Sequence, residues 1–150
     1  WRIDDAPDVD LRTKKGDDVA LKVCALYDWP RDRLSFGDRA KLAAASALSG
    51  QPLPTATVCY VVDARLPVGT WLVNAYTARL RMLVVQQHRA GAPRAWADNL
   101  RDLHDDFRRA FVDEWREGDV VPPLRAVLIG ADTDNTETDS LGYVRSIDLR

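Results

Sequence analysis

Residues 19–29 read VALKVCALYDW, and this stretch decides the fold class that the sequence predicts. Side chains of an extended chain point alternately to its two faces. Val19 and Val23 then share one face, Cys24 and Leu26 share the other, and both faces are apolar toward the end of the stretch. The pattern predicts a β-strand that is buried on both sides.

Five further stretches carry strand or hairpin patterns. The clearest is 78–87, ARLRMLVVQQ, where Leu80 and Met82 alternate with Arg79 and Arg81. The others are predicted strands at 55–63 (TATVCYVVD), 124–132 (LRAVLIGAD) and 141–150 (LGYVRSIDLR), and a turn or short hairpin at 66–77.

Two stretches show helical periodicity instead. In residues 35–50, Ser35 is suited to cap a helix, Ala-rich helix formers follow, and Gly50 is suited to end it. We predict a short amphipathic helix there, with Phe36 and several alanines on one face. A second helix is predicted from about 99 to 115, where apolar residues recur at helical spacing: Leu100, Leu103, Phe107, Ala110 and Phe111.

The order of these elements points to a fold class. Helices do not regularly separate the strands, which disfavours a doubly wound parallel sheet. The chain has 150 residues, of which 46% are hydrophobic, so it has the length of one domain and enough apolar side chains for a core. We predict a mainly β fold with inserted helices, as one largely antiparallel β-sandwich over residues 1–150.

Composition narrows the function classes. The net charge is −2 and charges of both signs are mixed along the chain, so no basic stripe favours nucleic acid as a partner. The sequence contains no run of about 18 apolar residues, so it predicts no transmembrane helix. His88 and His104 lack metal-ligand spacing, and no nucleophile elbow, phosphate-binding loop or dinucleotide fingerprint is present. The sequence indicates no cofactor, with calcium as the one exception considered below.

The two cysteines leave two interpretations open. Cys24 and Cys59 each lie inside a predicted strand. They are either two small buried hydrophobic residues or a cross-strand disulfide formed in an oxidising compartment.

Two polar loops are candidate binding sites. Lys14, Asp17 and Asp18 precede the buried strand, and their charges could bind a cation or hydrogen-bond a polyol, or form a turn with a local ion pair. The second loop holds Asp132 and Asp134, the predicted calcium ligands, with Asn135 and Thr136 as predicted ligand contacts. It lacks the glycine and the distal glutamate of a calcium-binding EF-hand loop, and such side chains also form turns without a ligand.

Aromatic and basic side chains supply further candidates. Trp29 and Trp71 lie at a strand end or turn, where a flat apolar face can stack on a sugar; a place in the core is the alternative. Arg81 lies within a strand and could pair with Asp17, Asp18 or a ligand carboxylate, although a surface arginine is the simpler interpretation.

Several segments together resemble a known family. DLRTKKGDDVALKVCALYD, LSFGDRAKLA, TATVCYVVDARLPVGT, NAYTARLRMLVVQ and GADTDNTETDSLGYVRSIDL occur in that order. The combination closely resembles the bacterial family of domain of unknown function 3047, over nearly the whole chain. Its polar pattern is matched here by Lys14, Asp17, Asp18, Arg81, Asp132, Asp134, Asn135 and Thr136.

The resemblance implies a location but no activity. Members look like exported proteins with a signal segment and further strands ahead of Trp1, so we expect a periplasmic or cell-envelope location and a chain that lacks its first strands. Three positions depart from the family pattern. Val19 replaces an aromatic residue, Val62 replaces a tryptophan, and Glu137 replaces a glycine.

A looser similarity concerns the fold. The order of the late segments is similar to that of the galactose-binding-like jelly roll, a fold that many carbohydrate-binding modules use. We therefore expect a non-catalytic β-sandwich that binds a glycan or another envelope ligand. The alternatives are a polysaccharide-active enzyme with paired aspartates, and a structural or protein-interaction module of the envelope, which an exposed apolar patch on the 35–49 helix would favour.

Overall fold

The computed structural model describes residues 1–89, 91 and 93–150. Most of the predicted elements are confirmed, and the stretches 19–29, 55–63, 78–87 and 124–132 all contain strands. The strands are β1 (Arg2–Asp5), β2 (Val19–Tyr27), β3 (Ala56–Asp63), β4 (Trp71–Val73), β5 (Leu80–Gln87), β6 (Leu124–Asp132) and β7 (Leu141–Tyr143), and the helices are α1 (Phe36–Ser49) and α2 (Leu103–Ala110).

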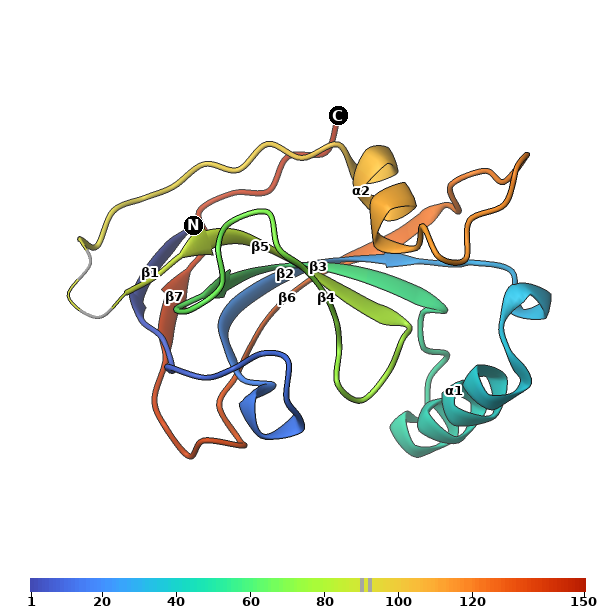
Figure 1. Cartoon of the computed structure of the whole chain (residues 1–150), viewed down its shortest axis with the longest axis horizontal. Coiled ribbons are helices and arrows are strands. Elements are labelled where there is room, and N and C mark those ends of the chain that lie inside the picture. Colours follow the sequence, from blue (N-terminus) through green and yellow to red (C-terminus); the bar gives the residue numbers. More distant parts are fainter. Residues whose placement is uncertain (90, 92) are drawn as a thin grey trace.

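The strands form two sheets (Figure 1). The larger sheet has the order β4-β5-β3-β2-β6, and β1 pairs with β7 in a second, two-stranded sheet. The mainly β class with inserted helices is therefore confirmed. The pairing is antiparallel except between β3 and β5, which run parallel. The jelly-roll topology stays a prediction.

The core lies on both faces of the larger sheet. Helix α2 covers one face, where Phe107 and Phe111 pack against Tyr27 and neighbouring side chains. On the opposite face, Leu11 of the loop before β2 packs with Met82 and other buried residues. Figure 1 shows α2 above the sheet and this loop below it.

A bulge in β2 changes one face assignment. The register between β2 and β6 shifts between Val19 and Lys22. Val19 therefore packs in the same cluster as Cys24, and the prediction that it shares a face with Val23 is wrong. An extra residue in one strand reverses the alternation of side chains beyond it.

The two cysteines lie opposite one another in the pair of strands β2 and β3. Both are buried, and they form a disulfide. Of the two interpretations of Cys24 and Cys59, the cross-strand disulfide is the one that the structure contains.

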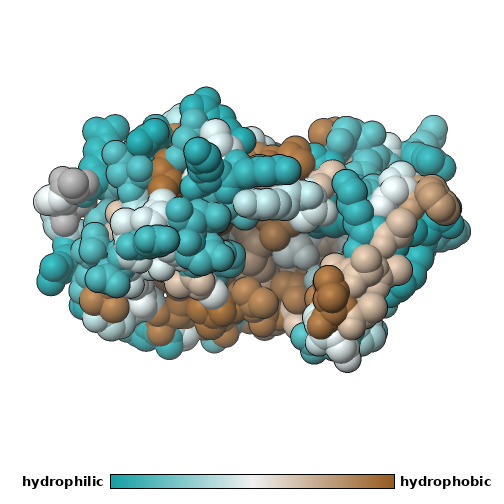
Figure 2. Space-filling model, turned by 90° about the horizontal axis from the view of Figure 1, so that it is seen from below, coloured by the Kyte–Doolittle hydropathy of each residue, from teal (hydrophilic) through white to brown (hydrophobic). Residues whose placement is uncertain are grey.

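Helix α1 begins and ends as predicted. The Ser35 side chain accepts a hydrogen bond from the Asp38 N–H at 3.0 Å, and Gly50 ends the helix in the left-handed conformation with φ 70°. Its packing is not as predicted, because Leu42 is its one buried residue and Phe36 is 81% exposed. Figure 2 shows hydrophobic surface on the underside of the molecule and on the segment at the right, where Figure 1 places α1.

Helix α2 is shorter than the predicted helix over 99–115. Asp102 caps it by accepting hydrogen bonds from the N–H groups of His104 and Asp105. The preceding residues 93–102, called the strap below, run extended across the face that α2 covers (Figure 1). Leu100 is 95% exposed, so its predicted place on the apolar face of the helix is wrong. In the described part of the chain, neither helix is long and apolar enough to cross a membrane.

Candidate functional site

Asp18 joins the two polar loops that the sequence singled out. Its side chain is 1% exposed. One carboxylate oxygen accepts hydrogen bonds from the backbone N–H and side-chain amide of Asn135, both at 3.2 Å. The other accepts from the backbone N–H of Thr136 at 2.8 Å and from its hydroxyl at 2.5 Å. The loops 14–18 and 132–136 therefore meet at the start of β2.

These four hydrogen bonds account for the electrostatic state of Asp18. Burial raises the pKa of a carboxyl group, but the hydrogen bonds from Thr136 and Asn135 outweigh it and hold the pKa of Asp18 below its ordinary value of 3.8. Two bonds to each oxygen use the carboxylate's accepting capacity. Asp18 therefore acts as the anchor of the 132–136 turn.

Further acidic groups lie around this anchor. One oxygen each of Asp18, Asp132 and Asp134 lie within 4.8 Å of one another. The Asp132 carboxylate raises the pKa of Asp134, and Lys22 Nζ lies 3.8 Å from Asp132. The predicted role of Asp132 and Asp134 as calcium ligands stays a prediction.

Asp17 and Lys14 also take part in contacts within the chain. Asp17 accepts a hydrogen bond from the Asn74 side-chain amide at 2.6 Å, and burial raises its pKa. The Lys14 ammonium lies 5.4 Å from the centre of the Tyr76 ring. A Cβ at Gly16 would clash with the backbone of Asp10, which explains the glycine between the lysines and the aspartates.

Glu137 adopts a conformation that suits glycine. Its φ is 50°, and it is the single non-glycine residue with positive φ among the described residues. The resemblance seen in the sequence implies a glycine at this position. The side chain there costs about 1–2 kcal/mol relative to ordinary backbone geometry.

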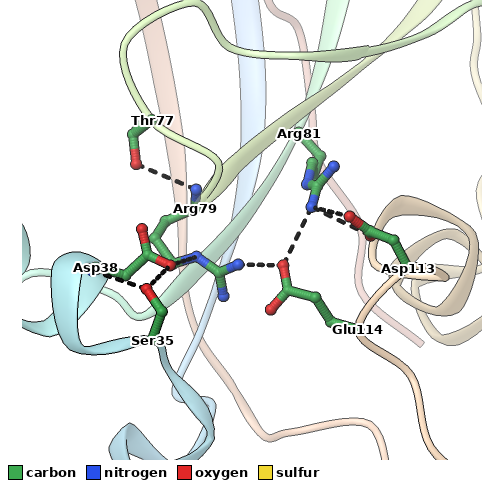
Figure 3. A network of polar contacts seen from close by, with 7 residues as sticks. All are labelled: Ser35, Asp38, Thr77, Arg79, Arg81, Asp113 and Glu114. Atoms are coloured by element: carbon green, nitrogen blue, oxygen red, sulfur yellow. Dashed lines mark hydrogen bonds and ion pairs between the residues drawn. The ribbon is translucent and has the colours of Figure 1, made fainter.

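Arg81 lies away from this cluster, and its predicted pairing with Asp17 or Asp18 is wrong. It is buried, so the alternative of a surface arginine is wrong as well. Its Nη2 donates to Asp113 at 3.0 Å and to Glu114 at 3.1 Å, and Arg79 also donates to Glu114 (Figure 3). These contacts tie β5 to the turn that follows α2.

Trp29 is a core residue, so its predicted role as a stacking platform is wrong. It is 4% exposed. Its ring packs edge-on against Phe107 and Phe111, with centroid distances of 5.1 and 5.3 Å. The alternation of apolar residues through β2 continues to Trp29 and carries it onto the face that α2 covers.

Trp71 lines an open groove. It is half-buried at the start of the edge strand β4, and it packs against the core cluster beneath α2. The groove beside it has a volume of about 310 Å³. Its walls combine Trp71 and apolar residues of β5 with four polar side chains: Asp98, Asn99, Arg101 and Arg109. An aromatic face next to several hydrogen-bonding groups is an arrangement that binds polar ligands.

The strap supplies three of these four polar residues. The Ala97 N–H donates to the Trp1 carbonyl at 2.8 Å, and the guanidinium groups of Arg2 and Arg145 lie 5.5 and 4.4 Å from the Trp96 ring. These contacts hold the strap beside the groove. The sequence did not predict Asn99 and Arg101 as site residues, because the predicted helix over 99–115 included them. Asp102, a residue type suited to cap a helix, marks the correct boundary.

A second hollow, of about 230 Å³, lies beyond α2. Trp29, Trp115 and the carboxylates of Asp113 and Glu114 contribute to its walls. Both carboxylates already bind Arg81, and the Trp29 ring lies in the core. The acidic cluster at Asp18 lines neither of these two hollows.

The fold and the groove define the class of protein: a disulfide-linked, mainly β domain with a surface groove at one sheet edge. The chain belongs to the family described as "Protein of unknown function (DUF3047)", whose model matches residues 1–148. This confirms the family resemblance seen in the sequence. No curated protein and no solved structure matches the chain.

Proposed function

We propose that the domain is a non-catalytic, exported binding module that binds a glycan in the groove beside Trp71. The observation that carries the proposal is the composition of the groove, where Trp71 lies next to Asp98, Asn99, Arg101 and Arg109. Sugars present apolar C–H faces that pack on aromatic rings and hydroxyl groups that exchange hydrogen bonds with polar side chains.

The disulfide supports an exported location. Disulfides persist in the periplasm and outside the cell, whereas cytosolic thiols are kept reduced. Cys24 and Cys59 are paired and buried in the larger sheet. The same inference favours an envelope glycan as the ligand, because such glycans are present in that compartment.

The proposal is tested by calorimetric titration of the protein with a panel of envelope and plant-type oligosaccharides. Replacing Trp71 with leucine keeps an apolar side chain against the core but removes the flat ring. We expect the affinity for the bound oligosaccharide to fall about two- to tenfold, because an aromatic contact contributes about 0.5–1.5 kcal/mol.

A matched control is Tyr76→Ala. Tyr76 is an exposed aromatic residue beside Lys14 and lies outside the groove. Its replacement should leave the affinity unchanged. If no oligosaccharide of the panel binds, or if Trp71→Leu binds as tightly as the parent protein, the proposal is wrong.

The two alternative functions remain predictions. An enzyme with paired aspartates needs two carboxyl groups across a cleft, whereas Asp18, Asp132 and Asp134 lie together in one cluster. A protein-interaction module would be favoured by the exposed apolar residues of α1, among them Phe36 and Leu48.

A further inference from the structure

We infer that Arg101 recognises a carboxylate on the bound glycan, so that the groove selects a uronic-acid-containing sugar, and that Asp106 holds Arg101 in place. This inference rests on the proposed function and names the ligand class of the same groove. Asp106 is a positioning residue in this account, because it acts through Arg101.

Asp106 is a buried carboxylate that accepts hydrogen bonds from two side chains, Tyr60 and Arg101. It is 1% exposed, in the first turn of α2. It accepts hydrogen bonds from the Tyr60 hydroxyl at 2.9 Å, from Arg101 Nε at 2.8 Å and from Arg101 Nη2. Burying a carboxylate without a counter-charge is costly. Arg101 supplies that charge, which fixes the position of its guanidinium.

Tyr60 of β3 helps to hold Asp106 in place, because its hydroxyl donates to the Asp106 carboxylate. Burial and the neighbouring Asp106 carboxylate raise the pKa of Tyr60 well above its ordinary value of 10.0. The hydroxyl therefore keeps its proton at physiological pH and continues to donate to Asp106. The Arg101 guanidinium lies 6.0 Å from the centre of the Tyr60 ring, so the ring also limits the movement of the arginine.

The other edge of Arg101 is open to a ligand. Nε and Nη2 bind Asp106, and Nη1 makes no hydrogen bond within the described part of the chain. The side chain is 37% exposed and lines the groove that holds Trp71. A guanidinium fixed along one edge presents its remaining N–H groups in a set direction and loses little entropy when it binds.

The chemistry of the groove favours a carboxylate as the partner. A guanidinium only donates hydrogen bonds, and a carboxylate offers it two charged acceptor oxygens. Arg109 lines the same groove, and its ion pair with Asp105 is exposed and weak. Two arginines therefore face the ligand, against the single carboxylate of Asp98 among the groove residues. A uronic acid combines this charge with the apolar sugar face that Trp71 can pack on.

The test compares two ligands by calorimetric titration: a galacturonic acid trisaccharide and its carboxyl-reduced, neutral counterpart. We expect the acidic trisaccharide to bind more tightly, by about tenfold or more, because hydrogen bonds between charged groups are strong. Replacing Arg101 with glutamine should remove most of this preference. Replacing Asp106 with asparagine should weaken it, because Arg101 is then no longer held in place. Both variants should still bind the neutral trisaccharide. This binding is the folding control, because a misfolded variant would bind neither trisaccharide.

Further variants separate positioning from general stability. Arg108→Gln changes an arginine of α2 that lies outside the groove, and it should keep the preference. Asp106→Glu keeps a carboxylate and should recover part of the preference for the acidic trisaccharide, whereas a purely structural role of Asp106 gives no recovery of this selectivity.

Equal affinity of the parent protein for both trisaccharides would overturn this inference and leave the proposed function standing. Binding of neither trisaccharide would overturn the inference, and the wider panel would then decide the proposed function separately.

Discussion

Single residues determine how the two polar loops meet. Asp18 and Thr136 are separated by 118 positions in sequence, so no local pattern could show that one accepts hydrogen bonds from the other. The sequence did single out both loops as polar clusters. The sequence could not show the strained backbone of Glu137 either, because its φ of 50° depends on the folded turn. The resemblance seen in the sequence implied a glycine there.

Replacing Asp18 with alanine should lower the free energy of unfolding by about 2–4 kcal/mol, because the four donors of Asn135 and Thr136 lose their charged acceptor. Asp18→Asn keeps the shape but removes the charge. The folded-state pKa of Asp18 lies below 3.8, so its charge stabilises the fold above about pH 4 and this contribution disappears as the pH falls through the folded-state pKa.

Urea denaturation of the parent protein and of Asp18→Asn at several pH values measures this effect. The difference in unfolding free energy should be largest near neutral pH and should shrink toward pH 3. A difference that stays constant with pH would show that the charge of Asp18 contributes nothing.

At the scale of elements, the sequence predicted where strands and helices occur better than how they pack. Capping residues located both ends of α1, because Ser35 and Gly50 act through local hydrogen bonds and backbone geometry. Alternation located β5, but the same alternation did not show that Arg79 and Arg81 are buried. That outcome depends on Asp113 and Glu114, which arrive from another part of the chain.

Helix α1 contributes a single buried side chain, that of Leu42, to the packing of the described residues. Leu42 is buried, whereas Leu48 is exposed on the same helix. Leu42→Ala should lower the free energy of unfolding by about 2 kcal/mol, and Leu48→Ala should change it by less than about 0.5 kcal/mol. Thermal and chemical denaturation of the two variants compares them directly. Equal effects of the two substitutions would contradict the observed packing of α1.

At the scale of the whole molecule, composition and element order indicated a single mainly β domain. They could not show the parallel pairing of β3 with β5, because β4 lies between these strands in sequence and at the sheet edge in space. They also left the state of the cysteines open. Pairing depends on strand register, which places Cys24 opposite Cys59.

The disulfide should make a large contribution to stability. It closes a loop with a sequence separation of 35 residues, and the loss of chain entropy in the unfolded state corresponds to about 3–4 kcal/mol. The double variant Cys24→Ala, Cys59→Ala should therefore unfold at a lower urea concentration than the parent protein. Under reducing conditions, the parent protein should approach the double variant, while the double variant should not change. An identical midpoint for the oxidised parent and the double variant would contradict this expectation.

The groove beside Trp71 is the central feature of the account, and nuclear magnetic resonance can test it directly. The bound oligosaccharide should shift the indole N–H signal of Trp71 and the backbone amide signals of residues 98–101. The signals of Asp18 and Thr136, at the start of β2, should remain in place. Shifts confined to the loops 14–18 and 132–136, with the Trp71 signal unchanged, would contradict the account.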